Sequence, residues 1–176
     1  MSLWWSLRLR SEAASVPFAR RLLLSTMERA GVDPEISYEL SVALTEACAN
    51  AVEHGTAGRG ADRGGAGRQD AYRVTAYLDG ELCRIEVADS GPGFPPARID
   101  GSTGAGSGPT PPGAGSGPTP PGAENGRGLD LIGELADDVR LSNRNGAVLS
   151  FDKTLKFSGA PAAAAVPART PSPAGV

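Results

Sequence analysis

The chain of 176 residues has few of the residue types on which several common classes of site depend. It contains two cysteines, Cys48 and Cys83, and a single histidine, His54. The cysteines lack the spacing of a metal or redox pair, so we expect both to be reduced residues of the core. Lys and Arg number 17 against 20 Asp and Glu. A net charge of −3 gives no basic footprint, so no direct contact with nucleic acid is expected.

Long apolar runs are also missing. No stretch of the sequence is long enough to span a membrane, so no membrane contact is expected. The first residues, 1–5, have no basic region ahead of their apolar side chains, and no signal peptide is predicted. These observations together predict a cytoplasmic protein.

Glycine and proline are abundant, at 24 and 15 residues, but they are concentrated in three segments. Residues 55–69 are rich in Gly, Ala and Arg and are expected to form a flexible loop with solvated arginines. The nonapeptide Gly-Ala-Gly-Ser-Gly-Pro-Thr-Pro-Pro occurs twice in tandem, at 104–112 and 113–121. Such a polar segment buries too little apolar surface to order itself, which predicts a low-complexity insert at about 101–123. Residues 158–176 are expected to be a disordered Ala/Pro-rich tail, leaving one domain over 1–157.

Between these segments, hydrophobic periodicity predicts an α+β fold. Alternating side chains predict strands at 3–10, 72–78, 82–89, 138–143 and 147–155. Asp79-Gly80 and Asn145-Gly146 are hairpin turn signals. Helical spacing predicts helices at 16–30, 34–54 and 128–136. The strands have one polar side, which suits a two-layer α/β sandwich with a mixed, mainly antiparallel sheet and helices on one face.

The predicted helix 34–54 carries a row of polar residues. Asp33 is a good N-cap, and a proline follows it at the first helical position. Glu46, Asn50 and His54 are four residues apart, so they stack on one helix face. Asn50 offers a carbonyl oxygen that a hard cation such as Mg²⁺ accepts. Glu46 offers a carboxylate that can take a proton from a hydroxyl or water. A solvated polar face is the alternative interpretation of this row.

Asp89 ends a predicted buried strand and is followed by two spaced glycines. Its carboxylate can accept a hydrogen bond from an exocyclic amine, such as that of adenine. Gly91 and Gly93 let the backbone turn sharply and leave room for a flat ring to approach. An ordinary Asp-Gly turn is the alternative.

A second pair of glycines stands at the start of the last predicted helix. Gly126 and Gly128, followed by Leu129, free backbone N–H groups to face an anion. Arg127 adds a charge contact. A simple junction of loop and helix is the alternative, because a lone Gly-x-Gly is a weak signal. The Gly-x-x-x-x-Gly-Lys pattern of a P-loop is missing from the sequence.

Taken in order, the three segments resemble the boxes of the Bergerat-fold ATPases. That superfamily includes gyrase, heat-shock chaperone ATPases, sensor histidine kinases and mismatch-repair proteins. Glu46-x-x-x-Asn50-x-x-x-His54 resembles the N box. Asp89-x-Gly91-x-Gly93 and Gly126-x-Gly128-Leu129 resemble the two glycine boxes. Within the superfamily, the sequences around residues 43–54 and 126–132 most resemble the stand-alone anti-sigma factor serine kinases.

The resemblance implies a set of functions for these residues. ATP and Mg²⁺ would be bound, with Glu46 as the catalytic base, Asn50 as the magnesium ligand and Asp89 as the adenine contact. The other members of the nucleotide site would be His54, Gly91, Gly93, Gly126, Arg127, Gly128 and Leu129. The segment between the glycine boxes would be a mobile lid, here lengthened by the tandem nonapeptide. The implied activity is phosphorylation of a serine or threonine of an anti-sigma-antagonist protein. A sigma factor and a second copy of the chain would be further partners.

Other functions remain open from the sequence. A non-catalytic switch would use the same residues to bind ATP, and its nucleotide state would control its affinity for a sigma factor or another regulator. The presence of Glu46 favours chemistry over that switch. A sensor histidine kinase needs an acceptor histidine on a helical hairpin, whereas His54 lies in the polar row. A gyrase- or chaperone-like machine would need a transducing domain, which the sequence lacks.

Overall fold

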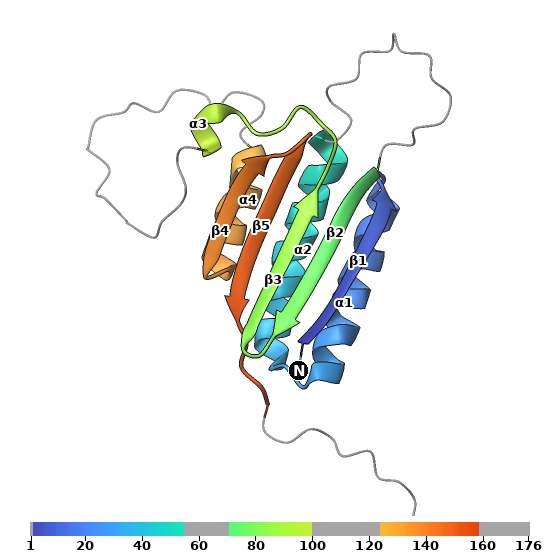
Figure 1. Ribbon diagram of the computed structural model, residues 1–176, viewed down its shortest axis with the longest axis vertical. Coiled ribbons are helices and arrows are strands. Elements are labelled where there is room, and N and C mark those ends of the chain that lie inside the picture. The colour runs from blue at the N-terminus through green and yellow to red at the C-terminus, as the bar shows by residue number, and fades with distance from the viewer. Residues whose placement is uncertain (1, 55–70, 100–123, 159–176) are drawn as a thin grey trace, which may run out of the picture.

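The computed structural model describes residues 2–54, 71–99 and 124–158 (Figure 1). In chain order its elements are β1 (Ser2–Arg10), the 3-10 turn η1 (Ala13–Ser15), α1 (Val16–Ala30), α2 (Pro34–His54), β2 (Ala71–Asp79), β3 (Leu82–Ala88), α3 (Pro96–Ile99), α4 (Glu124–Leu135), β4 (Asp138–Asn143) and β5 (Ala147–Thr154). The predictions for the loop 55–69, for the insert at about 101–123 and for residues 159–176 of the tail fall outside the described residues.

The five strands form one sheet in the order β1-β2-β3-β5-β4. The prediction of a mainly antiparallel sheet is confirmed, and every pair of neighbouring strands is antiparallel. β5 lies between β3 and β4, although α3, α4 and β4 separate it from β3 along the chain. Because β3 and β5 are antiparallel, the end of β3 lies beside the start of β5, with Ala88 opposite Val148. This edge of the sheet holds the candidate site.

Three helices cover one face of the sheet. Figure 1 looks onto the opposite face, and α1, α2 and α4 lie behind the strands. The inward residues of β2 alternate with exposed ones along the strand and are buried, from Tyr72 to Leu78. They pack in one core with Leu23 of α1, Leu44 of α2 and Ile132 of α4. The predicted two-layer α+β sandwich is therefore confirmed.

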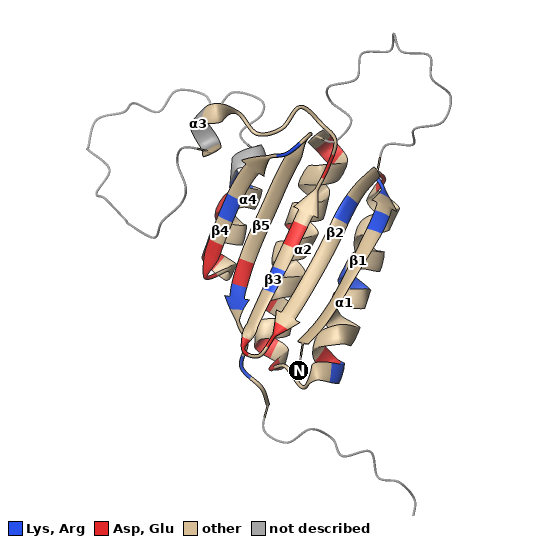
Figure 2. Cartoon of the chain, viewed as in Figure 1, with Lys and Arg blue, Asp and Glu red and all other residues tan. Residues whose placement is uncertain are grey.

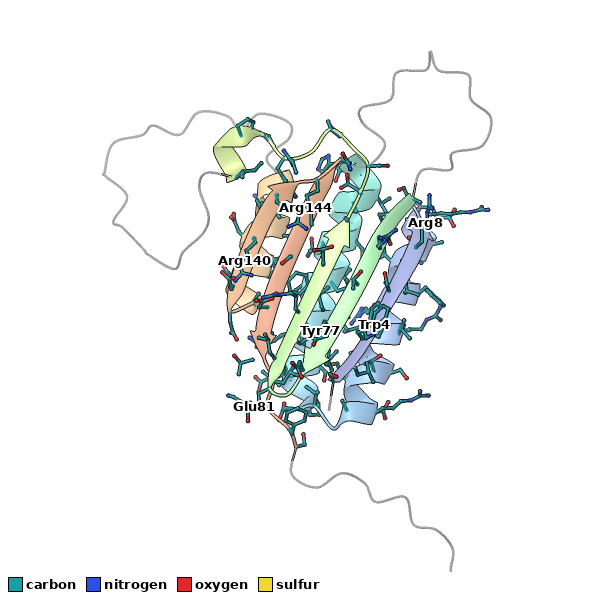
Figure 3. The ribbon with its side chains drawn as sticks, viewed as in Figure 1. Trp4, Arg8, Tyr77, Glu81, Arg140 and Arg144 are labelled. Atoms are coloured by element: carbon teal, nitrogen blue, oxygen red, sulfur yellow. The ribbon has the colours of Figure 1, made fainter. Side chains whose placement is uncertain are left out.

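The other face of the sheet has no helix over it within the described chain. The strands carry charged residues of both signs (Figure 2). Trp4 and Tyr77 lie opposite each other on β1 and β2 (Figure 3). Arg84 of β3 binds Asp152 of β5 through two hydrogen bonds of 2.7 Å. The hydrogen bonds from Arg84 hold the pKa of Asp152 below its usual value. This face is thus a polar surface tied together by cross-strand pairs.

Most predicted element bounds agree with the structure. α1 and α2 begin and end where the periodicity places them. The side chain of Asp33 caps α2, because Oδ1 accepts a hydrogen bond of 2.8 Å from the backbone N–H of Glu35. Both cysteines are buried free thiols, and burial raises the pKa of Cys48 and of Cys83 to about 12. None of the helices in the described ranges is long and apolar enough to cross a membrane.

Three details differ from the sequence prediction. The last helix begins at Glu124 and not at Gly128, so the glycine pair lies in its first two turns. The helix therefore includes both glycines, although glycine disfavours helix by about 1 kcal/mol. The short helix α3 was not predicted. Ser158, the first residue of the predicted tail, still donates a hydrogen bond of 3.1 Å to the backbone oxygen of Gly31.

Candidate functional site

A pocket of about 310 Å³ lies at the edge of the sheet where β3 ends and β5 begins. Its volume is at the small end of the range for ligand sites, on the order of 300–1,000 Å³. Its walls are mostly apolar, with a few polar side chains at defined positions. The lining residues are Ala47, Asn50, Ala51, His54, Val87, Asp89, Pro92, Gly93, Phe94, Pro95, Leu129, Ala147 and Leu149. Such a composition suits a flat, mostly apolar ring that carries a small number of polar groups.

The polar row of α2 meets α4 at one side of this pocket. Asn50 and His54 line the cavity, whereas Glu46 lies one turn earlier on α2. A Cβ built at Gly128 would lie 3.1 Å from Oε2 of Glu46 and 3.7 Å from both Oδ1 and Nδ2 of Asn50. The polar ends of the two side chains therefore lie beside the same part of α4. This part of the site can contact a cation or a hydroxyl group, because both interact with such oxygens.

Asp89 lies at the opposite side, directly after β3, and its carboxylate is oriented by backbone groups. Oδ1 accepts hydrogen bonds from the N–H of Gly91 at 2.7 Å and from the N–H of Ala147 at 3.3 Å. The N–H of Asp89 in turn donates to the backbone oxygen of Ala147 at 3.0 Å. Both side-chain contacts use Oδ1, and no hydrogen bond to Oδ2 occurs among the described residues. Oδ2 can accordingly accept a donor from a ligand in the pocket.

The loop after Asp89 forms a further wall of the pocket. Gly93 has a φ of 86°, a conformation that glycine adopts readily and other residues avoid. A Cβ at this position would lie 2.6 Å from Oδ1 of Asn143. Asn143, the last residue of β4, accepts a hydrogen bond from the N–H of Phe94 at 2.8 Å and donates one to its oxygen at 3.0 Å. Gly93 thus leaves room for the side chain of Asn143, which binds Phe94.

The β4–β5 turn packs closely against Asp89, the residue that precedes the same loop. Asn145 has a φ of 59° and Gly146 a φ of 144°, in agreement with the predicted Asn-Gly turn. A Cβ at Gly146 would collide with the backbone oxygen of Asp89. The close approach of the turn to Asp89 therefore requires glycine at this position.

The structure brings most of the predicted site residues together. Asn50, His54, Asp89, Gly93 and Leu129 line one pocket, Gly91 binds the carboxylate of Asp89, and Glu46 lies beside Gly128. Arg127 is exposed on α4 and is not among the lining residues of the pocket.

Sequence reasoning missed the apolar walls and the supporting asparagine. Phe94, Pro92 and Pro95 follow the predicted Asp89-x-Gly91-x-Gly93 segment directly, so their proximity to the motif was the available signal. For Asn143 the available signal was its position in the strand alternation. It lies on the same side of β4 as Val139 and Leu141, which face the core.

Comparison with known proteins agrees with this geometry. The family model described as the histidine kinase-like ATPase domain matches residues 9–153 of the chain. The chain belongs to the histidine kinase-like ATPase family. The family is one of ATPase domains, which implies that the chain binds ATP. Among curated protein sequences, none matches the chain.

The fold is shared with a solved structure of low sequence identity. It is described as the crystal structure of the RsbU and RsbW domains of Rv1364c from Mycobacterium tuberculosis. The two chains are 17% identical, with a TM-score of 0.55 over 87% of this chain. The match covers 32% of that longer chain. At this identity the similarity shows a common fold.

Proposed function

We propose that this protein binds Mg-ATP and transfers the γ-phosphate to a serine or threonine of a partner protein. The observation that carries the proposal is the position of Glu46. It lies beside Gly128, outside the pocket that Asp89 and Phe94 form, and next to Asn50 in the same row of α2. In this proposal the phosphates lie on that side of the site, where the carboxylate would act on an incoming hydroxyl group and not on the base of ATP.

The donor set at this side fits a magnesium ion. Mg²⁺ prefers oxygen ligands and is usually held by one or two protein groups together with phosphate oxygens and water. The carbonyl oxygen of Asn50 would hold the ion, and the carboxylate of Glu46 is the next oxygen along the row. When bound, the ion supplies neutralisation of charge on the phosphates.

Residues of the chain would bind the other parts of the nucleotide and carry out the proton transfer. Asp89 would orient adenine through Oδ2, against the apolar walls from Ala47 to Leu149. The triphosphate would extend towards Asn50 and the first turns of α4, where backbone N–H groups and Arg127 favour an anion. The partner hydroxyl oxygen would attack the γ-phosphorus, the bond to the β-phosphate oxygen would break, and ADP would leave. Glu46 would take the hydroxyl proton.

The proposed partner is an anti-sigma-antagonist protein, and the protein itself would be an anti-sigma regulatory factor. The resemblance of residues 43–54 and 126–132 to the anti-sigma factor serine kinases supports this choice. A sigma factor as second partner, a homodimer and a cytoplasmic location belong to the same proposal. Direct contact with nucleic acid or a membrane does not.

Substitution of Glu46 by glutamine tests the proposed chemistry. Glu46→Gln keeps the size and much of the hydrogen bonding but removes the base. It should bind Mg-ATP as the wild type does and lose about 10²–10⁴-fold in phosphate transfer, the usual contribution of a general base. Transfer of label from γ-labelled ATP to candidate partners encoded beside the gene measures the rate, and calorimetry measures nucleotide affinity.

Glu53→Gln is the matched control, because Glu53 is an exposed carboxylate on the last turn of the same helix. It should transfer phosphate at the wild-type rate. A wild-type rate in Glu46→Gln would show that Glu46 is not the base. A wild type that binds partners but phosphorylates none of them would replace the kinase with a nucleotide-dependent binding switch.

A further inference from the structure

One wall of the proposed ATP pocket is held by a side chain that belongs to none of the motifs. The loop from Pro92 to Pro95 lines the pocket at the end of β3. Asn143 lies outside the pocket at the end of β4, four residues before Ala147, with which it pairs in the sheet. It has the same parity as Val139 and Leu141, which pack against the core. At the end of the strand, this side of the sheet borders the pocket and no longer the core.

Asn143 binds both backbone groups of a single loop residue. Its Oδ1 accepts the N–H of Phe94 at 2.8 Å, and its Nδ2 donates to the oxygen of Phe94 at 3.0 Å. A side-chain amide therefore pairs with Phe94 as a neighbouring strand would. The side chain also fills the space beside Gly93, where a Cβ would lie 2.6 Å from Oδ1. Gly93 and Asn143 are thus a matched pair, in which the first leaves the space that the second occupies.

We propose that Asn143 is a positioning residue for the nucleotide, acting through Phe94. The inference rests on ATP binding in this pocket. The two hydrogen bonds hold the ring of Phe94 and the loop 92–95 as a preformed wall beside Asp89. Without them, binding has to order the loop as well as the ligand, and the cost in conformational entropy lowers affinity.

This role is separate from stability of the domain. Asn143 is exposed, and both of its side-chain hydrogen bonds run to the loop and not to the core. Its loss should therefore free the loop while the sheet and helices stay folded. Because the wall contacts the base and not the phosphates, affinity for adenosine and for ATP should fall by the same factor.

Calorimetric titration of adenosine and Mg-ATP into Asn143→Ala provides the first test. Loss of two exposed hydrogen bonds should weaken both ligands by about tenfold, with little change in melting temperature. Arg144→Ala is the matched control, because Arg144 is the exposed neighbour in the β4–β5 turn (Figure 3). It should bind both ligands as the wild type does.

A double-mutant cycle then asks whether Asn143 acts through Phe94. Phe94→Ala removes the ring but keeps the backbone groups that Asn143 binds. If Asn143 acts by positioning the ring, adding Asn143→Ala to this background should cost about twofold or less. A full tenfold additional loss would overturn the proposed route through Phe94.

Asn143→Asp provides a measurement that would not change if Asn143 had only a structural role. The aspartate keeps the acceptor for the N–H of Phe94 but, when ionised, has no donor for its oxygen. Protonation restores a donor, so the ratio of its dissociation constant to that of the wild type should fall towards one as pH is lowered. If Asn143→Ala does not fold, the pH dependence of this ratio tests the inference, and a ratio independent of pH overturns it.

A wild type that binds neither ligand would instead contradict ATP binding, whereas normal binding by Asn143→Ala would overturn the positioning role alone.

Discussion

At the scale of single residues, Asp89 shows how backbone groups aim a carboxylate. The N–H groups of Gly91 and Ala147 both bind Oδ1, which fixes the plane of the side chain. One oxygen is thereby used by the fold, and the other remains for the ligand. At the far side of the pocket, Asn50 offers its amide beside Gly128. The two residues should therefore recognise different parts of the same nucleotide.

Substitutions at these two positions should reduce binding in different ways. Asp89→Asn turns part of an acceptor into a donor, and should weaken adenosine and Mg-ATP alike by about 1–3 kcal/mol. Asn50→Ala removes the proposed magnesium ligand, and should weaken Mg-ATP strongly while adenosine binds nearly as before. Calorimetric titration of both ligands into both variants measures the difference.

Asp79→Asn serves as the control, because Asp79 is an exposed carboxylate at the β2–β3 turn, far along the strand from the pocket. It should leave both affinities unchanged. Equal losses of adenosine and Mg-ATP in Asn50→Ala would argue against a metal role for that residue.

At the scale of elements, the Arg84–Asp152 pair joins β3 to β5 on the uncovered face of the sheet. Asp152 is 7% exposed, whereas the side chain of Arg84 is 45% exposed. Hydrogen bonding by Arg84 lowers the pKa of Asp152 below 3.8, with smaller contributions from the charges of Arg84 and Arg140. The folded state thus favours the ionised carboxylate. Solvent around Arg84 limits the contribution to about 1 kcal/mol or less.

This shift predicts part of the acid sensitivity of the fold. Because the folded pKa is depressed, the stabilisation is present above the unfolded value of 3.8 and is lost as pH falls through the folded value. Asp152→Asn should therefore lose less stability than the wild type between about pH 6 and about pH 2.5. Urea midpoints at both pH values measure the change. Asp130→Asn, at an exposed position on α4, should behave as the wild type. An acid loss as large in Asp152→Asn as in the wild type would refute the linkage.

At the scale of the whole molecule, the proposed ATP pocket is built from segments that are distant in the chain. α2, the end of β3, α4 and the start of β5 each contribute lining residues. A ligand in the pocket contacts all four, and the pocket exists only when they are assembled. Nucleotide binding is therefore coupled to the folding of the entire domain.

Mg-ATP should accordingly raise the melting temperature in a concentration-dependent way. At about one hundred times the dissociation constant, ligand binding adds about 2.7 kcal/mol to the free energy of unfolding. For a domain of this size that corresponds to a shift of roughly 5–10 °C. Differential scanning fluorimetry over a series of ATP concentrations measures it. Asp89→Asn should need more ATP for the same shift. An unchanged melting temperature at saturating ATP would contradict binding in this pocket.

The sequence by itself determined the local structure and the recognition motifs. The periodicity of residues 34–54 predicts α2 to the residue, and the four-residue spacing of Glu46, Asn50 and His54 places them on one face of that helix. These features depend on helical geometry within a few turns, which the chain carries locally. The two hairpin turns are likewise encoded by residues that accept positive φ, namely Gly80, Asn145 and Gly146. The first turn lies at Gly80-Glu81, one residue later than predicted, because Asp79 still pairs with Leu82 in the sheet.

Only the tertiary structure decided which segments meet. The insertion of β5 between β3 and β4 brings Ala147 to Asp89 and Asn143 to Phe94. It depends on pairing between strands about 60 residues apart, since Ala88 lies opposite Val148, and no local pattern specifies such a partner. The start of α4 at Glu124 was likewise not given by the local pattern, because the helix includes two glycines of weak helix propensity. Local geometry thus places the proposed site residues on their elements, whereas long-range packing brings those elements together around the pocket.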